Sequence, residues 1–224
     1  YSFNNKVVEN HFQDSRDMVV WYSRDNVLSG NTGVGGRYSI HPEEWKPGES
    51  GHPLPHDRGF ERWYGTLGGA GSYFYPHTLM RDGQLVPLGL DDEGFYYTDA
   101  ISDEAVQAVR QHADDPRPFF LFVSYTAPHW PLHALPEDIE RYRGRYSQGW
   151  GAIRTARHER MKGMGLLSER WPISPRDEMA PDWSAIAYQD WEDARMAVYA
   201  AQVDRMDQGV GRILDALREQ GLED

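Results

Sequence analysis

Two histidines, His129 and His133, come just after the most apolar stretch of this 224-residue chain. This apolar run begins at Phe119 and is bounded by Pro118 and Pro128. Imidazole exchanges a proton near neutral pH, so a histidine beside a substrate can act as a general acid or base. The spacing of His129 and His133 fits two interpretations equally well: residues of a functional site, or histidines on a surface loop.

The apolar run predicts the element that would position these histidines. It is too short for a helix, and prolines limit it at both ends. Its aromatic composition is typical of a β-strand that is buried on both faces. In open α/β sheets, ligands bind at the carboxyl ends of the strands. His129 therefore falls where a site is expected.

Four blocks of the chain resemble a known family. The stretch Tyr125-Thr-Ala-Pro-His-Trp-Pro-Leu-His-Ala is similar to a signature of the sulfatases, in their bacterial arylsulfatase branch. Three further blocks are similar to the family and follow its order: Arg58-Gly-Phe-Glu-Arg-Trp-Tyr-Gly, Arg141-Tyr-Arg-Gly-Arg-Tyr and Val198-Tyr-Ala-Ala-Gln-Val-Asp-Arg-Met-Asp. Residues 1–57 match the family poorly.

The resemblance implies a fold and a reaction. The fold is α/β, part of an alkaline-phosphatase-like three-layer architecture with a mostly parallel central sheet. The reaction is hydrolysis of a sulfate monoester, with a small sulfated molecule as substrate. In the family, a formylglycine hydrate made from the cysteine of a Cys-x-Pro-x-Arg motif attacks sulfur. A divalent cation, commonly calcium, binds Asp and Asn oxygens.

This chain contains no cysteine and neither a Cys-x-Pro-x-Arg nor a Ser-x-Pro-x-Arg pattern, so it lacks the motif from which formylglycine is made. The resemblance therefore implies an internal fragment of a sulfatase that is inactive alone, with the nucleophile and the calcium ligands outside it. We assign no metal ligand in this chain. Three carboxylates are better explained as loop, cap or solvent-face residues: Asp92, Asp99 and Asp204.

Two site residues carry over from the family. The resemblance implies that His129 touches the sulfate ester and is a candidate proton donor. Where the family has Gly-Lys-Trp-His, this chain has Gly36-Arg-Tyr-Ser. Arg37 then takes the place of a sulfate-contacting lysine, and Ser39 that of a histidine. A guanidinium can bind sulfate through two hydrogen bonds, so Arg37 is a candidate substrate-binding residue.

Two other functions stay open. One is hydrolysis of a phosphonate or phosphate monoester by an enzyme of the same superfamily, which the nucleophile and metal-binding segments would distinguish. The other is a non-catalytic, sulfatase-like binding protein. The Gly36-Arg-Tyr-Ser departure and the absent cysteine motivate this second alternative.

Composition limits the remaining functions. The formal charge of −12 argues against an extended nucleic-acid surface, and no segment approaches the roughly 18 apolar residues of a membrane span. The apolar fraction of 39% is enough for a packed core. The glycine-rich segment Asn31–Arg37 lacks the Lys-Ser/Thr of a phosphate loop, so a loop is favoured over a nucleotide site.

The first half of the chain predicts three elements before the apolar strand. Asp57–Tyr75 mixes glycine with aromatic residues and is interpreted as a loop, either lining a pocket or packing under the sheet. Thr78–Pro87 predicts a hairpin with an Asp82-Gly turn. A helix is predicted to run to His112, capped by Thr98 or Asp99, with a buried face of Ile101, Ala105, Val106 and Val109.

The second half predicts helices around a proline-rich loop at 171–182. A short helix begins at Pro136. Arg154, Arg157, His158 and Arg160 form either an anion patch or, as we favour, a solvated helix face. A long helix ends at Gly221, with Gly209 and Gly211 allowing close packing. Its predicted core positions are Met196, Tyr199, Val203, Met206, Val210, Ile213 and Leu217.

These elements give a domain prediction that covers the whole chain, 1–224, as part of one catalytic domain. Residues 58–135 form its core segment with the active-site strand, 136–190 an insertion over the site, and 191–224 a core helix.

Overall fold

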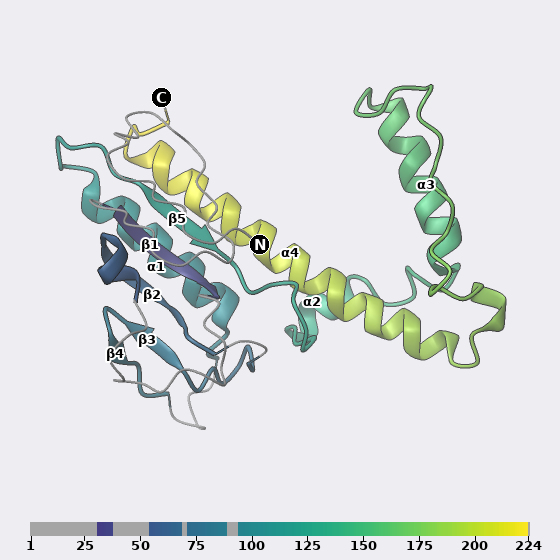
Figure 1. Ribbon diagram of the computed structural model, residues 1–224, viewed down its shortest axis with the longest axis horizontal. Helices are drawn as coiled ribbons and strands as arrows, with labels where there is room; N and C mark the ends of the chain where they lie inside the picture. Colours follow the sequence, from purple (N-terminus) through teal and green to yellow (C-terminus); the bar gives the residue numbers. More distant parts are fainter. Residues whose placement is uncertain (1–30, 38–53, 69–70, 89–93, 224) are drawn as a thin grey trace, which may run out of the picture. The chain divides into compact units, whose positions relative to one another are not determined.

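The computed structural model describes residues 31–37, 54–68, 71–88 and 94–223, and for 31–37 the backbone alone (Figure 1). The chain forms two compact units. The first contains Tyr1–Pro131 and Met206–Asp224, and the second contains Leu132–Arg205. Ser39 and Asp92 lie outside the described residues, as does Asp17–Tyr22, whose sequence is consistent with a strand.

A five-stranded sheet in the order β4-β3-β2-β1-β5 forms the centre of the first unit. β1 runs parallel to β2 and to β5, whereas β3 is antiparallel to β2 and β4 is antiparallel to β3. The sheet of the described residues is therefore mixed, with a parallel part made of β2, β1 and β5. The strands are β1 Asn31–Arg37, β2 Phe60–Thr66, β3 Leu79–Arg81, β4 Gln84–Leu85 and β5 Leu121–Ser124.

Two of these strands correct the sequence prediction. Asn31–Arg37 is not a loop but β1, which has a strand on each side. Asp57–Tyr75 is not a loop throughout, because it contains β2. Glycine has a low strand propensity, but hydrogen bonds from both neighbours hold β1 extended, and strand propensity yields to such context. Short-range sequence patterns cannot contain this information.

The hairpin prediction is confirmed. β3 and β4 pair through Met80 with Leu85 and Arg81 with Gln84. Asp82 has φ 49° and Gly83 has φ 86°, which is the pair of positive angles that a type I′ turn requires. Asp82 Oδ1 also accepts a hydrogen bond from the Trp63 amide at 2.7 Å, and this contact links the turn to β2.

The apolar strand is confirmed as β5, but its predicted burial on both faces is wrong. All four residues of Leu121–Ser124 are only partly buried. Among the described strands, β5 pairs with β1 alone and so lies at the edge of the sheet. In the described sheet, one long side of β5 has no partner strand, and this contributes to its partial exposure.

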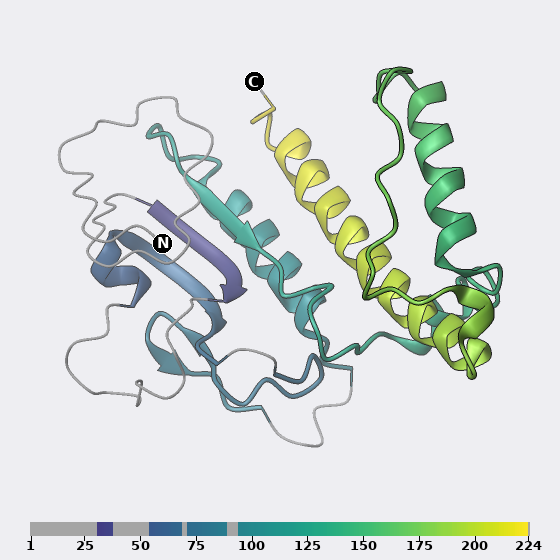
Figure 2. The same ribbon diagram turned by 45° about the vertical axis from the view of Figure 1, so that its right-hand side comes forward.

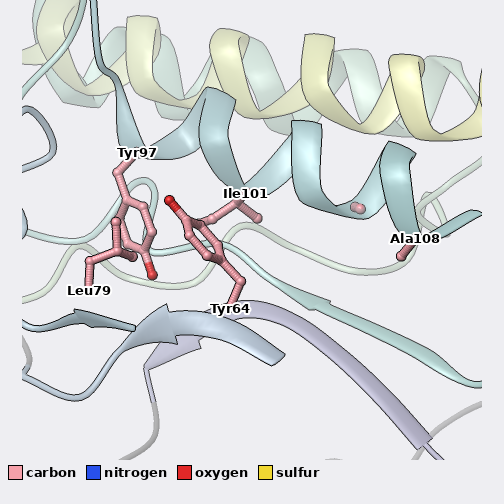
Figure 3. Packing of buried hydrophobic residues seen from close by; sticks show 6 residues of the cluster. Tyr64, Leu79, Tyr97, Ile101 and Ala108 are labelled. Atoms are coloured by element: carbon pink, nitrogen blue, oxygen red, sulfur yellow. The ribbon is translucent and has the colours of Figure 1, made fainter. Parts of the chain in front are cut away.

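Helix α1, Tyr97–His112, packs against one face of the sheet (Figure 3). Its predicted buried face is confirmed, since Ile101, Ala105, Val106 and Val109 are all buried. Ile101 packs with Tyr64 and Leu79 from the strands, and the full burial of each aliphatic side chain contributes about 1.5–3 kcal/mol. A short 3₁₀ helix, η1, covers Pro55–Arg58 before β2.

The start of α1 differs from the prediction. The N-cap is Tyr96, and no side chain caps the helix. The hydroxyl of Thr98 is buried and has no hydrogen-bond partner within the described part of the chain. Instead, the Tyr97 amide donates to the Tyr73 carbonyl at 2.8 Å. The amides of a first helical turn need acceptors, and here one of them comes from a loop distant in sequence.

Helix α4, Gln189–Glu219, confirms the long C-terminal helix and part of its predicted core face, since Ile213 and Leu217 pack on buried apolar clusters. Met196, Tyr199, Val203 and Val210 are exposed, whereas Met206, Ile213 and Leu217 are partly buried. The closest packing is made by small side chains, which let neighbouring elements approach the helix backbone. The residues of α4 that are buried are Asp193, Ala197, Ala201, Gln202, Gly209 and Ala216.

The end of α4 follows the prediction. Gly221 has φ 68°, and its amide donates to the Arg218 carbonyl at 3.0 Å. The Leu222 amide donates to the Leu217 carbonyl at 2.9 Å. These two bonds form a Schellman motif, in which a left-handed glycine ends the helix. Leu217 and Leu222 pack with Val109 of α1 in the same apolar cluster.

The second unit contains α2, Pro136–Glu140, and α3, Gly149–Gly163, as well as the first part of α4 (Figure 2). Pro136 occupies the first turn of α2, as predicted. A 3₁₀ turn, η2, covers Trp183–Ala185. Arg154 donates to the Ser174 carbonyl, and His158 Nε2 bonds the Trp171 carbonyl.

The basic residues of α3 therefore have two kinds of role. Arg157 and Arg160 are exposed, in agreement with a solvated helix face. Arg154 and His158 instead hold the proline-rich segment along the helix. That segment, 171–182, has no regular secondary structure, as the prolines predict.

Candidate functional site

The parallel strands β2, β1 and β5 bring their carboxyl ends to one edge of the sheet. Arg37, the last residue of β1, pairs with Thr66, the last residue of β2. Gly35 of β1 pairs with Ser124, the last residue of β5. Because the three strands run in the same direction, the segments that follow them leave the sheet at the same edge.

Both predicted site residues belong to this edge. Arg37 ends β1, and the structure describes its backbone but not its side chain. His129 follows β5 in a loop of the same unit. The topology thus brings to one edge two residues that lie far apart in the sequence. His133, the other candidate histidine, lies in the second unit.

The loop that carries His129 is held by main-chain hydrogen bonds. The His129 amide donates to the Thr126 carbonyl at 2.9 Å and closes a turn. The His129 carbonyl accepts a hydrogen bond from the Tyr73 hydroxyl at 2.9 Å. The imidazole is exposed, and its Nδ1 lies 2.6 Å from the Trp130 carbonyl oxygen. An exposed imidazole on an anchored backbone can exchange protons with a substrate.

Two tyrosines tie helix α1 to this edge. The Thr66 amide donates to the Tyr97 hydroxyl at 2.9 Å, and burial raises the pKa of Tyr97 to about 12. Tyr125, the residue after β5, places its hydroxyl 2.9 Å from Ser102 Oγ, and burial raises the pKa of Tyr125 as well. Ser102 Oγ donates to the Thr98 carbonyl, so it accepts from Tyr125.

Gly209 of α4 fits against the same pair of hydroxyls. A Cβ at this position would meet Ser102 Oγ and would lie 2.7 Å from the Tyr125 hydroxyl oxygen. The predicted close packing is therefore confirmed for Gly209. It is wrong for Gly211, where an added Cβ would meet nothing within 4 Å.

The described residues offer no calcium site. Within them, no group of three or more His, Cys, Asp or Glu side chains could hold a metal ion. Asp99 lies in the first turn of α1, and Asp204 of the second unit accepts a hydrogen bond from Arg141 at 3.1 Å. We therefore assign no metal ligand among the described residues and derive no step through a metal.

Sequence reasoning missed Tyr73, Tyr97 and Ser102, which support the site through hydroxyl groups. Each is buried in the first unit. No local pattern marked them, because their partners are Thr66, His129 and a residue next to β5. The only signal was the density of aromatic residues around 73–75.

The described part is thus an α/β protein with an imidazole and a guanidinium residue at the carboxyl edge of its parallel strands. A sulfatase family model matches residues 17–224, and the chain belongs to the sulfatase family. It is 30% identical over 202 residues to an uncharacterized sulfatase of Schizosaccharomyces pombe, an alignment that covers 83% of this chain and 36% of that protein. It is also 30% identical over 193 residues to an arylsulfatase of Klebsiella aerogenes, covering 80% of this chain and 40% of that enzyme.

Solved structures share the fold. The chain matches Ps i-CgsB in complex with k-i-k-neocarrahexaose with a TM-score of 0.52 and 24% identity, over 88% of this chain and 35% of that one. A protein from a glycosaminoglycan-metabolising locus of Bacteroides thetaiotaomicron matches with a TM-score of 0.51 and 19% identity, over 86% and 37%. The chain spans 36% and 40% of the two curated relatives. Among the described helices, none is long and apolar enough to cross a membrane.

Proposed function

We propose that this segment belongs to a hydrolase of sulfate monoesters, in which His129 protonates the oxygen of the leaving group and Arg37 contacts the sulfate. The observation that carries the proposal is the position of His129, exposed on an anchored loop just after β5. Arg37 supports it as the last residue of a parallel neighbour. The small sulfated substrate is an aryl sulfate on this proposal, as for the Klebsiella relative.

Each of the two residues answers one need of the reaction. When the S–O bond breaks, its electron pair stays on the leaving oxygen, and a proton from imidazolium neutralises that oxygen. A guanidinium placed on the sulfuryl oxygens stabilises their negative charge. On this proposal, the intact protein has the three-layer, alkaline-phosphatase-like fold with a mostly parallel central sheet, and the site lies at the carboxyl ends of its parallel strands.

The attacking group has no counterpart in this sequence. The chain has neither a Cys-x-Pro-x-Arg nor a Ser-x-Pro-x-Arg pattern, and within its described residues no group of three or more His, Cys, Asp or Glu side chains could hold a metal ion. We therefore expect that the 224 residues alone do not turn over an aryl sulfate, even with calcium present. The family's nucleophile and cation belong to a longer, intact family member on this proposal.

The test uses a family member that contains this segment and a working nucleophile. In it, kcat/KM of wild type and His129→Ala is measured over aryl sulfates whose phenols differ in pKa. Loss of a general acid lowers kcat by roughly 10²–10⁴-fold. The loss should grow as the phenol becomes more basic, because a poor leaving group needs the proton most.

The control is His77→Ala, which removes an exposed histidine of the same unit. It should leave the rates unchanged for every phenol. Equal slopes against phenol pKa for wild type and His129→Ala would reject the acid role and leave sulfate binding. No loss of activity would remove His129 from the site.

The same series separates the alternative functions. A phosphonate or phosphate monoester hydrolase should turn over the corresponding phosphorus esters faster than the sulfates. A binding protein should bind an aryl sulfate, with Arg37→Ala weakening that binding, and should turn over none of these esters. The binding-protein alternative is tested because this chain has Gly36-Arg-Tyr-Ser in place of the family's Gly-Lys-Trp-His and contains no cysteine.

A further inference from the structure

We propose that Tyr73 is a positioning residue for His129, and that the loop it holds makes Nε2 the nitrogen that exchanges a proton with the substrate. The inference deepens the proposed function and rests on it for the catalytic meaning of the proton. The orientation itself can be tested without any turnover.

The first step is the contact of His129 with its neighbour's main chain. Nδ1 lies 2.6 Å from the Trp130 carbonyl oxygen. A carbonyl oxygen can only accept, so Nδ1 must carry the hydrogen of this bond. Neutral His129 therefore has its lone pair on Nε2, and protonation adds a hydrogen to Nε2 alone. Imidazole in water favours the opposite tautomer, so this choice is made by the loop.

The second step is the accessibility of Nε2. The His129 side chain is exposed, and within the described residues no hydrogen bond involves its Nε2. The nitrogen that changes its protonation is thus also the one without a protein partner there. It is available to a substrate oxygen.

The third step is what fixes the loop. Both main-chain groups of His129 are bonded: its amide to the Thr126 carbonyl and its carbonyl to the Tyr73 hydroxyl, each at 2.9 Å. The first bond lies within the loop, whereas the second ties the loop to a distant part of the chain. Loss of the Tyr73 bond would let the 129–130 main chain rotate and would weaken the alignment of the Trp130 carbonyl with Nδ1.

Tyr73 is itself held in place. Its side chain is 2% exposed, and its ring stacks on Tyr96 with centroids 6.0 Å apart and planes 26° apart. Its carbonyl accepts from the Tyr97 amide at 2.8 Å, and the Tyr97 hydroxyl accepts from Thr66 at the end of β2. The hydroxyl that reaches His129 is therefore positioned by the sheet and by the start of α1, not by the loop it holds.

The arrangement defines the proton step. The N–H bond at Nε2 breaks as an O–H bond forms on the leaving oxygen, which keeps the electron pair of the S–O bond. The sulfuryl group passes to the attacking oxygen nucleophile. His129 is left neutral with its hydrogen on Nδ1, still bonded to the Trp130 carbonyl. The same nitrogen can then be protonated again without a turn of the ring.

The experiment is ¹⁵N NMR of the imidazoles in the full chain, at a pH where histidine is neutral. His129→Gln assigns the signal. We expect the tautomer with hydrogen on Nδ1 to dominate in wild type. In Tyr73→Phe the buried ring stays and the hydroxyl is lost, so the population should move toward hydrogen on Nε2. Tyr75→Phe is the matched control, because Tyr75 is exposed and its hydroxyl makes no hydrogen bond among the described residues.

The outcomes are separable. Dominant hydrogen on Nε2 in wild type would overturn the proposal, and this measurement needs no variant to fold. An unchanged tautomer in a Tyr73→Phe protein that is folded by circular dichroism would overturn the role of Tyr73. The dependence of His129→Ala on leaving-group pKa judges the proposed function separately, since the tautomer is measured without a substrate.

Discussion

A single methyl group added to helix α4 should have opposite effects on stability at Gly209 and Gly211. Both positions are in the same helix, and alanine gains up to about 1 kcal/mol over glycine in a helix interior. At Gly211 nothing lies within 4 Å of an added Cβ. Gly211→Ala should therefore stabilise the protein by up to about 1 kcal/mol.

Gly209 faces two hydrogen-bonded hydroxyls. An added Cβ would meet Ser102 Oγ, with the Tyr125 hydroxyl oxygen at 2.7 Å and Ser102 Cβ at 3.2 Å. Ser102 is fully buried, and its Oγ bonds both the Thr98 carbonyl and Tyr125. Overpacking costs about 1–3 kcal/mol, and a broken hydrogen bond costs about 0.5–1.5 kcal/mol. After a helix gain of about 1 kcal/mol, Gly209→Ala should destabilise the protein by about 0.5–3.5 kcal/mol.

The assay is urea unfolding followed by far-ultraviolet circular dichroism, with the free energy of unfolding compared among the two variants and wild type. A double-mutant cycle with Ser102→Ala identifies the cause, because it removes the Oγ that the new methyl group meets. Gly209→Ala should cost about 1 kcal/mol less in that background, since contacting residues are coupled by amounts of this size. Equal stability of Gly209→Ala and Gly211→Ala would refute the reasoning.

Two further predictions concern a buried carboxylate and a buried phenol. The Asp193 carboxylate accepts hydrogen bonds from the Gly144 amide at 2.9 Å and the Tyr146 amide at 2.7 Å. Asp193→Asn turns an amide donor toward one of these amides, so it should lower the free energy of unfolding in urea by about 1–3 kcal/mol. The control Asp207→Asn, at an exposed position, should change it by no more than about 0.5 kcal/mol, and an equal loss for both variants would contradict the role of Asp193. Burial raises the pKa of Tyr97 from 10.0 to about 12, so the folded state holds this proton more tightly than the unfolded chain. The resulting stability is complete below pH 10 and should fall by about 2–3 kcal/mol as the pH rises from about 10 to about 12. Unfolding measured against pH should give a shallower alkaline loss in Tyr97→Phe, and an identical slope would show that this phenol does not contribute.

The sequence alone determined the features that depend on neighbouring residues. The Asp82-Gly pair predicts its turn because Asp and Gly tolerate the positive φ angles that both positions adopt. The apolar spacing of α1 predicts its buried face, and Gly221 predicts the end of α4, since one glycine completes a local hydrogen-bond pattern. The motif around His129 predicted the family, because a motif needs only the order of residues.

Tertiary structure decided the features that depend on distant partners. β1 is a strand because β2 and β5 bond it from both sides. The buried positions of α4 include small residues such as Gly209, where neighbouring elements come close to the helix. Arg37 and His129 share an edge only because their strands pair in parallel. The hydroxyl that fixes the loop of His129 comes from Tyr73, 56 residues away. Such contacts form when the chain closes on itself, so residue order and spacing cannot contain them.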